Sequence, residues 1–403
     1  MTKEKMSQKK VKKPLHIAIM STNLLPTPPL GQKTIYAPLW LTSQLADSLV
    51  ERGHKVFLFG SSDSKTKGTL ISLGLPSMVK NKEWGNAYKK LTEIGKQAST
   101  ENHGLTWAIK WKEVLREHYE LLLASKLFQM ANTGAFDIIQ FHAPPRVLQF
   151  VPFAKTPVVA TIHDTFPHPL ESYANKIIYG ALDKYCSKNL YFISVSNVQR
   201  KPLPNINYAA TVHHGIDVKK FSFSNQRGEY LAFAGRIVPQ KGIHIAMDVA
   251  KKTGRKIKIA GSIPPESTYY WEQEIKPRLS ANATYEGMLS PKQMISFYQK
   301  AEALMMPIML DESFGLVMVE AMACGTPVIG FKRSTVPELV KHKKTGYVVR
   351  DEKEMIAAVK NLDKIKRDDC RSWVEENFSL EAMVENYEKV YYKIIAKIKG
   401  NKL

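Results

Sequence analysis

Short apolar runs alternate with longer amphipathic stretches through the first half of the chain. The apolar runs have the length of buried β-strands. They are 16–21, 55–60, 136–142, 157–163 and 190–196. Leu41, Leu45 and Leu49 recur at helical spacing between the first two runs, and a second helical pattern covers 105–131. This alternation predicts βαβ units in a doubly wound parallel sheet, which binds ligands at the carboxyl ends of its strands.

The same rhythm restarts after a looser stretch at 197–227. Strands are expected at 229–235, 256–261, 284–287, 304–309, 327–331 and 346–349. Helices are expected at 242–252 and after Ser290, a favourable N-cap that is followed by a proline suited to the first turn. Two Rossmann-like halves that join near residue 220 predict an N-terminal domain of residues 1–220, a C-terminal domain of 221–380 and a ligand cleft between them.

The length and composition are those of a folded protein with two domains. The chain has 403 residues, 44% of them hydrophobic and 24% charged. Its apolar runs are shorter than the roughly 18–20 residues of a membrane-spanning helix. Residues 1–14 contain six lysines but not the apolar segment of a signal peptide. Cys186, Cys324 and Cys370 lie far apart, without metal-binding spacing. We therefore expect a protein of the reducing cytoplasm, soluble or peripheral to a membrane.

A net charge of +21 is the strongest bias in the composition, with 58 lysines and arginines against 37 aspartates and glutamates. Basic chains bind nucleic acids, anionic membranes or anionic substrates. The lysines concentrate locally at 9–13, 251–258 and 341–344. Because the chain has no zinc finger, aromatic RNA-binding signature or basic-region heptads, nucleic acid is the second choice. A basic face resting on anionic lipid and a generally lysine-rich proteome explain the charge equally well.

Two glutamates, Glu312 and Glu320, stand eight positions apart around the expected start of an apolar helix. A helix N-terminus carries unsatisfied backbone donors and partial positive charge, which suits the phosphates of a sugar nucleotide. Glu312 is placed to reach the sugar, and Glu320 to accept hydrogen bonds from ribose hydroxyls. The alternative is a solvated acidic loop before a helix with one charged residue. Apolar residues surround Glu320 in the sequence, however, and a charge buried among them needs a partner.

A pair of cations, Arg236 and Lys241, brackets the turn between an expected strand and the next helix. Arginine offers a planar fork and lysine a point charge, and both can converge on one diphosphate. They would stabilise the negative charge that grows on a nucleoside diphosphate as it leaves, without a metal ion. No Asp-x-Asp motif, which would hold a divalent ion, occurs in the chain. Two unrelated surface cations are the alternative.

Four segments of the C-terminal half resemble, in order and spacing, the retaining nucleotide-sugar glycosyltransferases of family 4. These segments are 233–242, 259–261, 312–320 and 325–328. Looser matches occur at 334–339 and 345–347, and the N-terminal half adds 53–54, 136–142 and 213–217. The resemblance spans most of the chain. It implies the GT-B fold, an α/β architecture of two Rossmann-like doubly wound domains that face a central cleft.

The resemblance also implies a role for each matched residue. Glu320 would bind the ribose, Glu312 the transferred sugar, and the backbone at Gly315 would approach the ligand closely because no side chain intervenes. The expected donor-binding residues are Gly31, Gly235, Arg236, Lys241, Gly261, Glu312, Ser313, Phe314, Gly315, Leu316 and Glu320. The expected catalytic residues are His163, Arg236, Lys241 and Glu312. Transfer would retain the anomeric configuration, with the donor phosphate taking the acceptor proton. The resemblance implies no metal, no cofactor and a UDP- or GDP-sugar as donor.

The N-terminal half is expected to bind the acceptor. Many family members have a Gly-Gly pair after the first strand, near the donor phosphate. Here Gly31 is followed by Gln32, and Lys33 either supplies a compensating cation or belongs to a displaced loop. His163 ends an expected strand and matches a histidine thought to lie beside the reacting sugar; the alternative is a structural histidine that caps the strand. For His142, at the end of the neighbouring strand, the structural and functional interpretations are evenly matched.

The last stretch of the chain has an amphipathic helical pattern that includes Met383, Tyr387 and Tyr391. The final helix of GT-B enzymes often crosses back to the N-terminal domain, and the resemblance implies this for residues 381–403. A free amphipathic helix at a membrane interface is the competing idea. Tyr391, Tyr392 and the lysines beyond them suit such an interface.

These features together predict a cytoplasmic, metal-independent, retaining hexosyltransferase of cell-envelope polysaccharide or glycolipid biosynthesis. Its partners would be a nucleotide-sugar donor and a lipid- or glycan-linked acceptor, and peripheral contact with an anionic inner membrane face stays open. Two other classes also stay open. One is a sugar-nucleotide-processing GT-B enzyme such as an epimerase, which needs no acceptor, or a phosphorylase, which needs a lysine for pyridoxal phosphate. The other is a non-catalytic basic protein that binds nucleic acid or anionic lipid with strong salt dependence.

Overall fold

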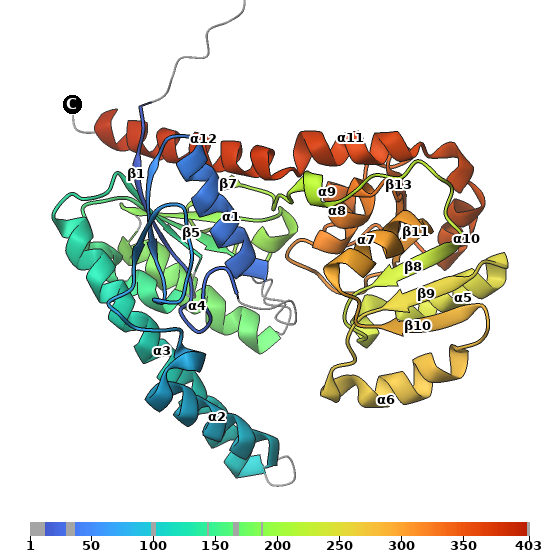
Figure 1. Cartoon of the computed structure of the whole chain (residues 1–403), viewed down its shortest axis with the longest axis horizontal. Helices are drawn as coiled ribbons and strands as arrows, with labels where there is room; N and C mark the ends of the chain where they lie inside the picture. Colours follow the sequence, from blue (N-terminus) through green and yellow to red (C-terminus); the bar gives the residue numbers. More distant parts are fainter. Residues whose placement is uncertain are drawn as a thin grey trace, which may run out of the picture. The chain divides into compact units, whose positions relative to one another are not determined.

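The computed structural model describes residues 13–29, 37–97, 102–142, 145–163, 169–186 and 188–400 (Figure 1). These residues form two compact units. One unit contains the described residues up to 159 except 37–41, and the other contains 37–41 together with the described residues from 160 onward.

The first sheet is built from the apolar runs of the N-terminal half. Its strands are β1 (His16–Met20), β2 (Lys55–Phe59), β3 (Thr69–Ile71), β4 (Ile138–Phe141), β5 (Val158–Ile162), β6 (Leu190–Ser194) and β7 (Tyr208–Thr211). Their order is β3-β2-β1-β4-β5-β6-β7, and β1 pairs in parallel with both β2 and β4. Every residue of β4, β5 and β6 is buried. Strands buried on both faces read as continuous apolar runs, which is why the sequence pattern locates them.

Four long helices accompany the described part of this sheet. They are α1 (Ala37–Glu51), α2 (Lys82–Gln97), α3 (Asn102–Asn132) and α4 (Pro169–Cys186), with a 3-10 segment at Pro145–Phe153. The helices α1 and α3 confirm the two that the sequence pattern predicts. The pattern does not predict α2, which packs along α3 and brings the rings of Trp84 and Tyr119 to a centroid distance of 5.1 Å.

The second sheet is also parallel. Its strands are β8 (Tyr230–Ala234), β9 (Ile257–Ala260), β10 (Ala283–Gly287), β11 (Ala301–Met306), β12 (Val328–Phe331) and β13 (Gly346–Val349). They lie in the order β10-β9-β8-β11-β12-β13, and all neighbouring strands are parallel. The prediction of a strand at 304–309 is wrong at both ends. That strand ends before Pro307, since proline lacks the N–H that a central strand donates.

Some helices of the second sheet begin or end at residues with clear capping roles. They are α5 (Ile243–Thr253), α6 (Thr268–Tyr270), α7 (Pro291–Gln299), α8 (Leu316–Ala323), α9 (Val336–Leu339), α10 (Glu352–Lys360) and α11 (Arg367–Asn377). Ser290 and Gln293 form a reciprocal capping box at the start of α7, which confirms the predicted cap. Gly254, with φ +67°, ends α5 in the left-handed conformation that glycine tolerates.

The final helix α12 (Leu380–Gly400) packs against strands of the first sheet. Tyr387 and Tyr391 are 1% and 0% exposed, and the Tyr387 hydroxyl lies 3.0 Å from the Thr161 hydroxyl on β5. Lys397 lies over the ring of Tyr191 on β6. The competing idea of a free helix that places Tyr391 in a membrane interface is therefore wrong, because this side chain is in the protein interior. Within the described parts of the chain, every helix is too short or too polar to span a bilayer.

Candidate functional site

Two glycines, Gly235 and Gly261, follow directly after β8 and β9 in the second sheet. A Cβ atom on Gly261 would lie 1.7 Å from the carbonyl oxygen of Gly235, so only glycine fits there. Gly261 has φ +154° and Gly235 has φ +147°, which side chains rarely adopt. The two backbones thus run close together at the carboxyl edge of the sheet, where parallel sheets bind ligands.

The predicted cations lie just beyond this edge. Arg236 follows Gly235 and is exposed, and Lys241 ends a short 3-10 turn before α5. The Lys241 side chain is 13% exposed, and its ammonium forms an ion pair with the Glu312 carboxylate. Burial and the charge of Arg236 lower the pKa of Lys241 from 10.5 to about 8, while the Glu312 charge acts in the opposite direction. The two cations are therefore close enough for their charges to interact.

Glu312 has one oxygen engaged and one available. Oε1 accepts from Lys241, whereas the buried Oε2 has no hydrogen-bond partner among the described residues. The Glu312 backbone N–H donates to the Ser334 hydroxyl at 2.7 Å, which fixes the loop that carries the carboxylate. A buried carboxylate oxygen without a partner is costly, so a ligand hydroxyl at Oε2 would relieve that cost.

The backbone between Glu312 and α8 leaves room beside this oxygen. Gly315 has φ +97° at the start of α8, and a Cβ there would lie 2.6 Å from Met318 Cε and 3.6 Å from Glu312 Oε2. The Phe314 carbonyl accepts from the Thr335 hydroxyl, and the Phe314 ring is 2% exposed. Ser313 and Leu316, which flank this turn, are partly exposed. The segment 313–316 thus begins the helix within reach of the predicted sugar contact.

Glu320 lies in the second turn of α8 and has the partner that its apolar setting demands. The Tyr298 hydroxyl on α7 donates to Glu320 Oε2 at 3.0 Å. Burial raises the pKa of Glu320, and the Tyr298 hydrogen bond opposes that rise. The interpretation of Glu320 as one charge on a solvated helix is therefore wrong. Sequence reasoning did not find Tyr298, since no local pattern links residues 22 positions apart.

His163 lies at the end of β5 in contact with a second histidine. The rings of His163 and His214 stack at a centroid distance of 5.4 Å, and the His214 ring meets the edge of Phe314 at 5.1 Å. Burial lowers the pKa of His163 to about 4, and burial also lowers the pKa of His214, with smaller effects of His163 and His213. Both imidazoles are neutral at pH 7, so His163 can exchange hydrogen bonds with a hydroxyl but is not a cation there.

Hydrogen bonds of Glu338 join the segment 334–339 to residues 197, 198 and 213. Glu338, four residues after Ser334, accepts hydrogen bonds from Asn197 N at 2.9 Å, Val198 N at 3.0 Å and His213 Nε2 at 3.2 Å. Burial alone would raise the pKa of Glu338, but these hydrogen bonds lower it below 4.5. The loosely matched motif 334–339 therefore positions the loop of Glu312. Its Ser334 hydroxyl accepts the Glu312 N–H, and its Glu338 carboxylate anchors the motif to other segments.

A buried charge cluster beside β1 was not predicted. Glu120 on α3 is fully buried and accepts from the Thr22 hydroxyl, two residues beyond β1. Arg116 Nε and Arg146 Nε each lie 3.3 Å from a Glu120 oxygen, and both arginine side chains are 16–17% exposed. The four-residue spacing of Arg116 and Glu120 was the only sequence signal. Glu113 Oε2 also lies 3.8 Å from a nitrogen of each guanidinium, so two carboxylates balance the two arginines beside the carboxyl edge of the first sheet.

Gly31, Gln32 and Lys33 are outside the described residues. His142 is 6% exposed, and its backbone N–H donates to Met20 O at 2.8 Å. Across the described ranges, no three His, Cys, Asp or Glu side chains gather as metal ligands would.

The sequence of this chain is similar to those of known glycosyltransferases. Residues 216–386 match the family described as glycosyl transferases group 1. The N-acetyl-alpha-D-glucosaminyl L-malate synthase of Bacillus anthracis is 24% identical over 398 residues, covering 90% of this chain and 95% of that protein. The phosphatidyl-myo-inositol mannosyltransferase of Mycobacterium tuberculosis is 25% identical over 233 residues, so this chain spans 60% of that protein's length.

Solved structures share the fold of this chain. AviGT4, a glycosyltransferase involved in avilamycin A biosynthesis, has a TM-score of 0.62 at 18% identity, covering 95% of this chain and 98% of AviGT4. HepE of Anabaena, in complex with UDP and glucose, has a TM-score of 0.61 at 14% identity, covering 94% of this chain and all of HepE. The chain is a glycosyltransferase with the GT-B fold, which confirms the enzyme class and fold predicted from the sequence.

Proposed function

We propose that this glycosyltransferase moves a hexose from a nucleotide sugar to a lipid- or glycan-linked acceptor, with retention and without a metal ion. The observation that carries the proposal is the Lys241–Glu312 ion pair beside an unpartnered carboxylate oxygen and the side-chain-free Gly315. One group in this arrangement is a cation suited to phosphate, and the other is an acceptor suited to a sugar hydroxyl. Both come from the carboxyl edge of one parallel sheet, where a sugar nucleotide would bind.

The cations would bind the donor diphosphate. Arg236 offers a two-pronged fork and Lys241 a compact charge, and both would stabilise the charge that develops as the glycosidic bond breaks. Lys241 is held in position by Glu312 before the donor arrives. Interactions that strengthen as the leaving group becomes charged lower the barrier, and this pair supplies them without a divalent ion.

The two glutamates would bind the two sugars of the donor. Tyr298 holds one Glu320 oxygen, and the other oxygen would accept from ribose hydroxyls. Glu312 Oε2 would accept from a hydroxyl of the transferred hexose. In this proposal the donor phosphate takes the acceptor proton as the new bond forms on the same face of the sugar, and the neutral His163 binds a hydroxyl of the hexose.

The acceptor would carry an anionic group. The names of two relatives specify L-malate, a dicarboxylate, and phosphatidyl-myo-inositol, a phosphate diester. In this chain, Glu120 and, at longer range, Glu113 pre-position Arg116 and Arg146 at the edge of the first sheet. The nearby Ser21 Oγ and Asn23 Oδ1 are buried and have no hydrogen-bond partner in the described structure. A bound acceptor would supply partners for these atoms. A carboxylate or phosphate is what two guanidinium groups recognise best.

Hydrolysis and transfer assays test this function. UDP-glucose, UDP-N-acetylglucosamine and GDP-mannose are incubated with the enzyme, and the anomer released or transferred is identified by NMR before it equilibrates. We expect one donor to react, the product to keep the donor's configuration, and EDTA to leave the rate unchanged. Inversion would contradict the retaining mechanism, and activity lost to EDTA and restored by magnesium would contradict its metal independence. Donor turnover to an isomer without transfer or hydrolysis would favour the epimerase alternative.

The acceptor assignment has its own variant. Arg146→Gln should lower transfer to phosphatidyl-myo-inositol, a lipid-linked anionic acceptor, by about tenfold or more, since a charge-assisted hydrogen bond is lost. Donor hydrolysis should stay at the wild-type rate. Equal transfer by the wild type and the variant, or a preference for uncharged inositol, would show that these arginines do not bind the acceptor.

A further inference from the structure

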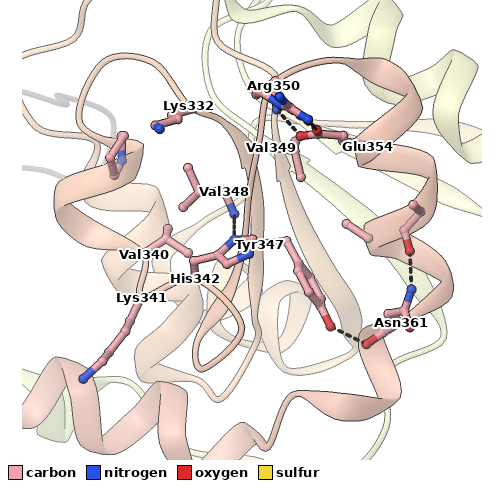
Figure 2. A pocket seen from close by; sticks show the side chains of 13 residues that line it. Lys332, Val340, Lys341, His342, Tyr347, Val348, Val349, Arg350, Glu354 and Asn361 are labelled. Carbon is pink, nitrogen blue, oxygen red and sulfur yellow. Dashed lines mark hydrogen bonds and ion pairs between the residues drawn. The ribbon is translucent and has the colours of Figure 1, made fainter.

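A cavity of about 860 Å³ opens beside the edge strand of the second sheet (Figure 2). The strand β13 is the last in the sheet order and pairs only with β12. The cavity lies among this edge, α10 and the segment around α9. It is lined by Lys332, Pro337, Val340, Lys341, His342, Tyr347, Val348, Val349, Arg350, Glu354, Ala357, Ala358 and Asn361.

The charged lining is strongly positive. Lys332, Lys341 and Arg350 line the cavity together with His342, and Glu354 is the one acidic residue in its lining. Glu354 is already engaged, because it accepts from Arg350 Nε at 2.6 Å and from the Arg350 backbone N–H at 2.8 Å. That engagement fixes the Arg350 side chain against α10, as Figure 2 shows.

A second hollow of about 470 Å³ continues the same surface. It shares Lys332 and Arg350 with the first cavity and adds Arg333. We name the combined feature the basic trough, defined by Lys332, Arg333, Lys341, His342 and Arg350. Part of the lysine concentration at 341–344, which the donor site does not use, thus belongs to a concave surface instead of a solvated face.

One of these groups, His342, is held in donating geometry, and contacts restrict the position of a second. His342 Nδ1 accepts from the Val348 backbone N–H at 3.1 Å, which leaves the proton on Nε2 as a donor (Figure 2). Lys341 lies over the Trp373 ring at 5.3 Å, which restricts its position. The walls between these donors are apolar and include Pro337, Val340 and Ala357. Cationic donors around apolar walls suit an anion that carries an organic group.

We propose that the basic trough binds a phosphate ester through residues other than those assigned to the donor site. A phosphate group offers several acceptor oxygens to lysine, arginine and histidine donors. Arg350, whose Nε and Nη2 contact Glu354 and whose side chain is 78% exposed, would donate to it from Nη1. The cavity is much larger than one phosphate group, so the esterified organic part would lie against the apolar walls. The same chemistry is present in a soluble phosphate ester and in an anionic phospholipid head group, and the experiment separates these two sources.

The test compares two double variants of equal charge change. Lys332→Gln with Lys341→Gln removes two cations of the trough. The control, Lys353→Gln with Lys360→Gln, removes two exposed lysines of α10 that do not line it. Calorimetry with glycerol 3-phosphate and sedimentation with phosphatidylglycerol–phosphatidylcholine vesicles measure the two sources. Circular dichroism checks that all proteins are folded.

The expected result is binding by the wild type and the control, and about tenfold or greater loss in the trough variant. If the trough variant loses binding of glycerol 3-phosphate, a soluble phosphate ester is sufficient for binding at the trough. If it loses binding of vesicles alone, the ligand is the lipid head group. Equal binding by the trough variant and the control, or no binding of either probe by the wild type, overturns the proposal. The proposal does not rest on the proposed function: Lys241→Met, which removes a donor-site cation, should leave binding at the trough unchanged.

Discussion

At the scale of single residues, the account depends on Glu312 and Lys241. Each side chain is less than one-fifth exposed, and each partly neutralises the other. A buried ion pair is weak evidence for stability, since desolvation cancels much of the attraction. The unpartnered second oxygen of Glu312 gives the pair a functional interpretation, because a structural ion pair would be expected to satisfy both oxygens.

Replacing Glu312 should affect turnover more than binding. In Glu312→Ala we expect kcat to fall tenfold or more, while nucleotide affinity changes little, because the carboxylate is assigned to the hexose and not to the nucleotide. Steady-state kinetics with the active donor measure this. Asp311→Asn is the matched control, since Asp311 is the neighbouring carboxylate and is 39% exposed. Equal losses in the two variants would contradict the assignment of Glu312.

The lowered pKa of Lys241 predicts a pH dependence of donor affinity. The protonated lysine binds a diphosphate, and the diphosphate in turn favours the protonated form. Since the pKa of Lys241 is about 8, affinity should be constant below pH 7 and weaken as the pH rises above about 8. Calorimetry between pH 6.5 and 9.5 measures the profile. The prediction fails if Lys241→Met shows the same decline at alkaline pH as the wild type.

The sequence predicted the charged residues of this site better than their partners. Glu312, Glu320, Arg236 and Lys241 stand in recognisable segments, so their chemistry is visible locally. Tyr298 and His214 became visible only in the fold, because their contacts with Glu320 and His163 join distant segments. Hydrogen bonds and ring contacts between distant residues have no periodic signature in a single sequence.

At the scale of secondary-structure elements, the decisive feature is the start of α8. Gly315 begins the helix with a positive φ and brings the backbone close to Glu312. The Ser334 and Thr335 hydroxyls hold the loop from the opposite side. The predicted elements were accurate where apolar runs were continuous, as in β5 and β13. They failed where one residue overrides the run, as Pro307 does at the end of β11.

Adding a side chain at Gly315 tests this helix start. Gly315→Ala should weaken nucleotide binding by about tenfold or more, because the new methyl group occupies the space beside Glu312 and strains the turn. The control is Gly254→Ala, which also has a positive φ but whose Cβ would meet no atom within 4 Å. The positive φ should cost each variant about 1 kcal/mol of stability, and Gly315→Ala should lose more because its Cβ would lie 2.6 Å from Met318 Cε. Calorimetry and thermal unfolding separate the two effects, and equal nucleotide binding by the two variants would refute this role of Gly315.

At the scale of the whole molecule, the alternation of strands and helices predicted two parallel sheets, and the structure contains them. The exact domain limits at 220 and 380 stay predictions. Composition alone did not show where the positive charge acts. Basic residues gather in a donor site, an arginine cluster and the basic trough, each assembled from separate segments. Charge runs locate basic residues, but only the fold shows which of them share a concave surface.

The measurement that tests the central claim most directly is calorimetry of UDP, GDP and ADP with the wild type and Glu320→Ala. The exposed Glu376→Ala serves as the control. We expect one nucleotide to bind to the wild type and the control, and Glu320→Ala to bind it about tenfold or more weakly, since a charged hydrogen-bond partner of the ribose is lost. If no nucleotide binds, or if Glu320→Ala binds as tightly as the control, the assigned donor site is contradicted.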